Sequence, residues 1–126
     1  MRHLVAAMLA VVAVIHLLPA VGVLGAARLE ALYGIPVQEP NLAILMRHRA
    51  VLFALLGVFL LVAAVRPAWQ PAALVAGFVS VLSFLALART VGGTNAQLQR
   101  VFAADVVALA CLVVGAVARV QQARGR

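Results

Sequence analysis

Three polar side chains interrupt an otherwise hydrophobic stretch of this sequence. Arg47, His48 and Arg49 lie within NLAILMRHRAVLFALLGVFLLVAAV. Charged side chains within membrane helices are rare, and they usually pair with one another or line a path or site for a ligand. A guanidinium group suits planar anions because its N–H donors form a rigid fork. We therefore predict a site for an acidic ligand near these residues.

Asp105 is the one acid within another apolar stretch. As a helix, residues 106–118 span only about 20 Å at about 1.5 Å per residue. If Arg119 marks one membrane edge, Asp105 must lie below the opposite surface, because the hydrocarbon core is about 30 Å thick. A short aspartate cannot reach the headgroups as a long arginine can, so it needs a partner. We expect an ion pair between Asp105 and Arg47 or Arg49.

Only one of the two arginines can face Asp105, because residues two apart project about 200° apart on a helix. The other arginine needs a different anion, which could come from Glu30, from Glu39, from a lipid phosphate or from a ligand. The alternative is that both arginines lie close enough to the boundary to extend to the headgroups.

His16 and Tyr33 complete the set of candidate residues. A lone membrane histidine more often forms an interhelical hydrogen bond than it binds a ligand. Haem or metal ligation would want a second histidine at the same depth, and we expect none there, so we predict no cofactor and no metal. No serine, histidine and acid spacing indicates a nucleophile, and no glycine-rich phosphate loop is present. The candidate ligand-binding residues are Arg47, His48, Arg49, Asp105, His16 and Tyr33.

The composition places this chain among integral membrane proteins. Of its 126 residues 67% are hydrophobic and 10% are charged, with a mean hydropathy of +1.16. The net charge of +7 does not indicate nucleic-acid binding, because the arginines flank or interrupt apolar stretches and form no polar patch. The single cysteine, Cys111, excludes an intramolecular disulfide.

The apolar stretches are long enough for four transmembrane helices, since about 20 residues cross the hydrocarbon core. We predict an all-α, integral membrane four-helix bundle that forms a single domain, residues 1–126, with spans at about 4–27, 41–65, 72–88 and 98–118. The small residues on its helix faces suit packing within the chain and a homo-oligomer alike.

Residues 28–40, which we call the lid segment, form the one sizeable polar connection. The sequence ARLEALYGIPVQEP predicts a short amphipathic extension of the first helix that ends at Gly34, followed by an extended stretch at Ile35-Pro36. This segment could cover the polar site, or it could be a plain connector at the membrane surface. The spacing of Thr94 and Gln97 predicts a capping box at the start of the last helix.

An even number of spans places both termini on the same side of the membrane. The connections and ends on that side hold more arginines than those on the other side, so the positive-inside rule makes the termini cytoplasmic. The lid segment and the polar site then belong to the outward-facing half of the bundle.

The segments ALYGI, NLAILMRHRAVLFALLGVFLL, LVAGFVSVLSFLALA and DVVALACLV together resemble a family of small bacterial four-helix membrane proteins of unknown function, which are similar in architecture to the DoxX-like group. The resemblance implies a multi-pass protein of the bacterial inner membrane. Members are sometimes labelled phosphopantetheine adenylyltransferase, but that activity belongs to a soluble α/β protein with a histidine-containing nucleotide signature, and this chain has neither.

Our leading hypothesis is a binding protein whose ligand is an anionic lipid or a small acidic or quinone-like molecule, with membrane lipids as its partners. One alternative is a small dimeric transporter, for which Asp105 would be the membrane-embedded acid. Another is a structural subunit of a larger membrane complex. None of these hypotheses requires catalysis.

Overall fold

The computed structural model describes all of residues 1–126 and contains helices and no strand, which confirms the predicted all-α class. Four helical segments are long and apolar enough to cross a membrane, which is the architecture of a multi-pass membrane protein. The helices in chain order are α1 (Arg2–Leu17), the 3-10 helix η1 (Leu18–Leu24), α2 (Ala26–Tyr33), α3 (Pro40–Val65), the 3-10 turn η2 (Pro67–Trp69), α4 (Gln70–Val91) and α5 (Ala96–Arg124).

The first span is not the continuous α-helix that the sequence predicts. It changes to the tighter η1 at Leu18. Pro19 has no backbone N–H and cannot donate to the carbonyl four residues earlier, so the α-helical pattern cannot continue through it unchanged. Gly25, with φ of 141°, then turns the chain into a separate helix α2. The predicted end of α2 at Gly34 is confirmed, because Gly34 takes the left-handed conformation with φ of 66°.

Side-chain caps define where α3 and α5 begin. The Glu39 carboxylate accepts hydrogen bonds from the backbone N–H groups of Asn41 and Leu42. At α5 the cap is Asn95, one residue after the predicted Thr94, and its Oδ1 accepts from the N–H of Leu98 at 2.8 Å. Each cap satisfies donors that have no partner within the first turn of the helix.

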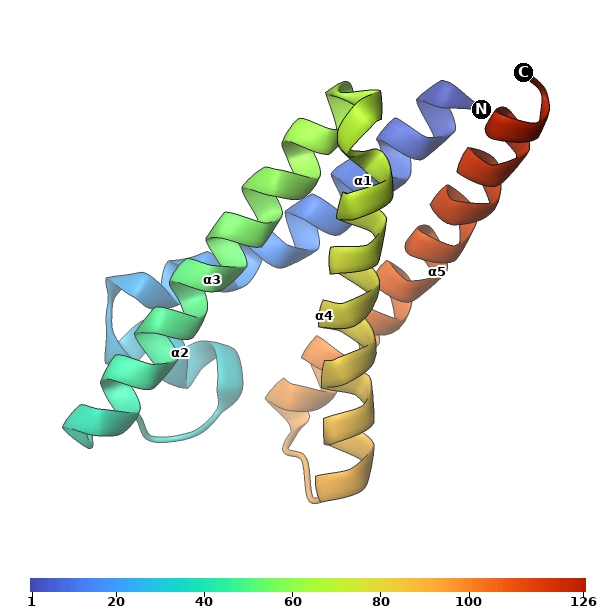
Figure 1. Ribbon diagram of the computed structural model, residues 1–126. Coiled ribbons are helices and arrows are strands. Elements are labelled where there is room, and N and C mark those ends of the chain that lie inside the picture. The colour runs from blue at the N-terminus through green and yellow to red at the C-terminus, as the bar shows by residue number, and fades with distance from the viewer.

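The core lies where α1 packs against α3 and α5, with α4 completing the bundle beside α5 (Figure 1). Small residues let these helices approach closely. A Cβ on Gly57 would lie 2.6 Å from the Leu17 side chain, and one on Gly77 would lie 2.8 Å from that of Leu112. The fully buried side chains of this core include Val5, Leu9, Val12, Ala13, Leu60, Ala63, Ala73, Val81, Ala108 and Leu112.

Both termini lie at the same end of the bundle, and α2 lies toward the opposite end (Figure 1). Large apolar side chains such as Leu55, Val75 and Val107 are exposed along the outer faces of the spans. This pattern suits a hydrocarbon environment, in which apolar side chains need no burial.

Candidate functional site

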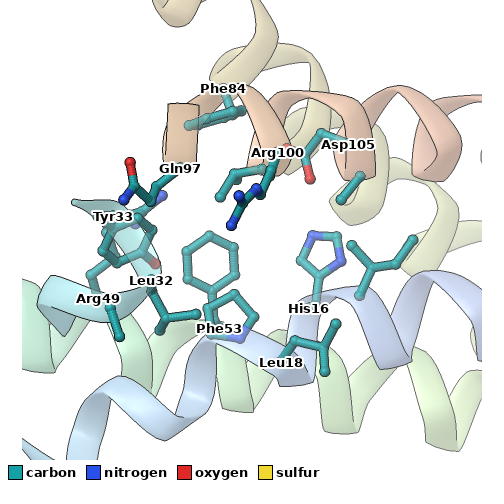
Figure 2. Close-up of a pocket in the computed structure, with 15 residues that line it drawn as sticks. His16, Leu18, Leu32, Tyr33, Arg49, Phe53, Phe84, Gln97, Arg100 and Asp105 are labelled. Atoms are coloured by element: carbon teal, nitrogen blue, oxygen red, sulfur yellow. The ribbon is translucent and has the colours of Figure 1, made fainter. Parts of the chain in front are cut away.

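A cavity of about 260 Å³ lies beside α2. Nine of its 15 lining residues are hydrophobic, and we call it the polar cavity for the polar and charged side chains among the other six. This volume is close to the lower end of the range for small-molecule sites, about 300–1,000 Å³. All the helices except η2 contribute to its wall, so a single residue range cannot form it. Its lining residues are Ile15, His16, Leu18, Pro19, Ala31, Leu32, Tyr33, Arg49, Phe53, Phe84, Gln97, Arg100, Val101, Ala104 and Asp105 (Figure 2).

Helix α2 covers one end of the polar cavity. Its buried residues Leu29 and Tyr33 form a small apolar cluster with Val37 of the lid segment, packed against side chains of α3 and α5. Asn95 holds α2 in this position. Its Nδ2 donates a hydrogen bond to the carbonyl of Tyr33 at 2.7 Å, while its Oδ1 caps α5. One side chain therefore joins the end of α2 to the beginning of α5.

Arg49 projects from α3 into the polar cavity and is held by stacking. Its guanidinium carbon lies 5.1 Å from the ring centre of Tyr33 and 4.7 Å from that of Phe53. Both distances fit cation–π contact, which leaves the N–H donors in the guanidinium plane free of the ring faces. The expected ion pair with Asp105 is not formed. The two side chains line the same cavity, but the guanidinium lies over the aromatic rings.

Helix α5 adds Arg100 and Asp105, both of which reach the cavity from one wall (Figure 2). The side chain of Asp105 is half-buried. Arg49 and Arg100 each carry a positive charge and Asp105 carries a negative one. The cavity therefore has an excess of one positive charge when its other lining residues are neutral. A bound group with one negative charge would balance this excess.

His16 lies on the wall opposite Asp105 and is 2% exposed (Figure 2). Its Nδ1 donates to the carbonyl of Val12 at 2.9 Å, because a carbonyl can only accept. In the neutral ring Nε2 is then the acceptor, so the Ser80 hydroxyl donates to it over 3.0 Å. The expected interhelical hydrogen bond of His16 is thus present, and His16 also lines the cavity.

Arg47 and His48, the other two sequence candidates, do not line the polar cavity. Both are exposed. The Nε of Arg47 donates a hydrogen bond at 3.1 Å to the carbonyl of Val23, which is one of the last carbonyls of η1. The two acidic side chains of the lid segment accept hydrogen bonds from backbone N–H groups. Glu30 accepts from the N–H of Val37, while Glu39 caps α3, so neither is the ion-pair partner we considered for the arginines.

Sequence reasoning missed several cavity residues, most importantly Arg100 and Gln97. The spacing of Gln97, Arg100, Ala104 and Asp105 is three, four and one, which places them on one broad face of a helix. That spacing could have identified Arg100. Phe53 and Phe84 carry no such signal, because aromatic residues in apolar helices are usually packing residues.

No group of three or more histidine, cysteine or acidic side chains lies close enough to hold a metal ion. The chain matches no family model, no curated protein and no solved structure. Fold and site together define a class, namely a small helical protein with four candidate membrane spans and a polar, arginine-containing cavity near the end opposite its termini.

Proposed function

We propose that this protein binds an anionic lipid or a small acidic or quinone-like molecule in the polar cavity, which faces outward from the bacterial inner membrane with both termini in the cytoplasm. The arginine-rich ends and connections support this orientation, and the four-span helical bundle is in keeping with a DoxX-like architecture.

The observation that carries the proposal is the state of Arg49. Its guanidinium group is positioned by two aromatic rings, yet it forms no hydrogen bond or ion pair with another group of the chain. A charge within a membrane-spanning segment is costly without a partner, and a planar guanidinium pairs best with a carboxylate or phosphate oxygen pair. With Arg100 nearby, a singly charged anion would be held between two guanidinium groups and would neutralise the cavity.

Native mass spectrometry of protein gently purified from membranes tests the proposal. We expect a defined additional mass on the wild type, and we expect it to be absent from Arg49→Gln/Arg100→Gln. Arg47→Gln is the matched control, because it removes an arginine two residues away that does not line the cavity. An absorbance spectrum of the same sample distinguishes a quinone-like ligand from a lipid. A wild type without additional mass, or a double variant that keeps it, would contradict the proposal.

Asp105 favours one second candidate function, a small transporter that couples its substrate to protons. It is the one acid within a candidate span, it faces the polar cavity, and it has no direct ion-pair partner there. Proton relays in transporters use acids placed in this way. Proton-driven efflux by reconstituted protein, lost in Asp105→Asn and kept in Asp105→Glu, would support transport. Equal efflux from wild-type and Asp105→Asn vesicles would exclude this mechanism.

A further inference from the structure

A second hollow, between two transmembrane helices, adjoins the polar cavity. This hollow, the α3–α4 groove, has a volume of about 310 Å³. Three residues, Arg49, Phe53 and Phe84, line both the cavity and the groove. The groove is lined from α3 by Arg49, Leu52, Phe53 and Leu56, and from α4 by Ser80, Ser83, Phe84 and Leu87.

The groove lies on the lipid-facing side of the bundle. Helices α3 and α4 meet at η2 and splay apart toward the other end, as Figure 1 shows. Leu52, Ser83 and Leu87 are exposed at the surface of these two spans, which would be in contact with acyl chains in a membrane. A molecule in the outer half of the bilayer would therefore meet the groove before it meets the cavity.

Access along the bundle axis is covered by α2. Tyr33 is 4% exposed, its backbone carbonyl is held by Asn95, and Leu29 and Val37 are buried beside it. A ligand that entered past α2 would have to break these contacts. The route between α3 and α4 passes only the side chains of Arg49, Phe53 and Phe84, which line both hollows.

The two hollows differ in chemistry. The cavity contains the excess positive charge of Arg49 and Arg100 over Asp105, which suits a head group with one negative charge. The groove shares Arg49 with the cavity and contains Ser80 and Ser83 of α4, and its leucine side chains at positions 52, 56 and 87 suit an aliphatic chain. The groove, of about 310 Å³, lies at the lower end of the range for small-molecule sites, about 300–1,000 Å³, which suits one slender apolar chain.

We propose that the ligand is a single-chain amphiphile with a carboxylate head, which enters from the membrane through the α3–α4 groove and places its head between Arg49 and Arg100 and its chain along Leu52, Leu56 and Leu87. This inference rests on the proposed anion-binding function and specifies the ligand and its route.

Photo-crosslinking of the full chain in phosphatidylcholine vesicles tests where the ligand lies. The probe is a palmitate analogue with a diazirine in the middle of its chain, and the readout is the labelling that excess palmitate suppresses. We expect suppressible labelling of Leu52, Leu56 and Leu87, reduced at least tenfold in Arg49→Gln/Arg100→Gln. Labelling that is spread evenly over all lipid-facing residues and resists competition would overturn the inference. If excess lysophosphatidylglycerol suppresses the labelling but excess palmitate does not, the proposed carboxylate head group is wrong.

Two tryptophan variants test the route. Leu87→Trp fills the groove, whereas Leu82→Trp places the same bulk at an exposed position of α4 that lines neither hollow. We expect suppressible labelling of Leu52 and Leu56 to fall at least tenfold in Leu87→Trp and to stay unchanged in Leu82→Trp. Equal labelling in both variants would overturn the lateral route, and the wild-type crosslinks provide a test that needs no variant to fold.

The failure of this inference can be told apart from the failure of the proposed function. If the wild type retains an additional mass that the double arginine variant loses, yet shows no suppressible crosslink in the groove, the anion site stands and the single-chain amphiphile is wrong. If the wild type retains no additional mass and shows no suppressible crosslink, both proposals are wrong.

Discussion

His16 and Ser80, which are 64 residues apart in the sequence, share a hydrogen bond of 3.0 Å that joins α1 to α4 inside the bundle. The bond lies where the polar cavity borders the α3–α4 groove, because His16 lines the first and Ser80 lines the second. The other ring nitrogen is tied to the Val12 carbonyl, so the imidazole has a partner at each end.

Removing the Ser80 hydroxyl should destabilise the bundle. In Ser80→Ala the Nε2 of His16 loses its partner, and we expect the free energy of unfolding to fall by about 1 kcal/mol, since interhelical hydrogen bonds in membrane proteins contribute about 0.6–2 kcal/mol. Ser83→Ala is the control, because the Ser83 hydroxyl bonds only to the Ser80 carbonyl of its own helix. Unfolding by sodium dodecyl sulfate in mixed micelles measures the difference. Equal losses in both variants would show that the His16 bond does not stabilise the fold.

Asn95 should have two separable roles. Asn95→Ala removes both the α5 cap and the bond to the Tyr33 carbonyl, whereas Asn95→Asp keeps the capping oxygen and loses the Nδ2 donor. We expect hydrogen exchange at the Leu98 amide to accelerate in the alanine variant alone, and exchange at the Gly34 amide, which closes α2, to accelerate in both. If the aspartate variant protects Gly34 as well as the wild type does, Asn95 does not hold α2 in place.

Alanine should destabilise the bundle at Gly57 but not at Gly115. A Cβ at Gly57 would lie 2.6 Å from Leu17 Cγ and 3.3 Å from the Ala13 carbonyl oxygen, so Gly57→Ala should force α1 and α3 apart and cost about 1–3 kcal/mol. At Gly115 the nearest atom would be Met8 Cβ at 3.4 Å, which is ordinary contact. Gly115→Ala should therefore be neutral, or stabilising by up to about 1 kcal/mol through helix propensity. The same unfolding assay compares them, and destabilisation of equal size would contradict this account of the α1–α3 contact.

The start of α3 should depend on pH through Glu39. Hydrogen bonds from the Asn41 and Leu42 backbone amides hold the pKa of Glu39 below its ordinary value of 4.5. Because the pKa is lower in the folded chain, the ionised cap stabilises α3 above the ordinary pKa, and this contribution is lost as the pH falls through the folded pKa. Carbon NMR of the Glu39 carboxyl should show a midpoint below 4.5, with the Asn41 and Leu42 amide shifts moving in parallel. Glu39→Gln should abolish the parallel movement, and a midpoint at or above 4.5 would refute the cap.

Local patterns in the sequence were sufficient for the class and most element boundaries. Long runs of alanine, leucine and valine determine the four membrane-spanning segments, because their length and apolarity match the thickness of the hydrocarbon core. Gly34 ended α2 as predicted, since only a residue without a Cβ takes a positive φ at no steric cost. The exact cap of α5 was missed because the neighbouring Thr94 and Asn95 could each serve as the cap. The change to a 3-10 helix at Leu18 was missed because transmembrane helices often accommodate a proline.

The membership of the site was decided by the tertiary structure. Sequence placed Arg47 and Arg49 on different sides of α3, but it could not say which one faces the cavity, because that depends on how α3 is rotated against α1 and α2. In the structure Arg47 donates a hydrogen bond to the Val23 carbonyl of η1, whereas the guanidinium group of Arg49 stacks on the rings of Tyr33 and Phe53. Arg100 joined the site only because α5 brings it opposite these residues. Ser80 met His16 only because α4, which packs on α5 and α3, brings Ser80 within reach of α1 at that depth. Composition and hydropathy therefore determined that this chain crosses a membrane, while helix rotation and depth, which no local pattern encodes, decided which polar groups share a cavity.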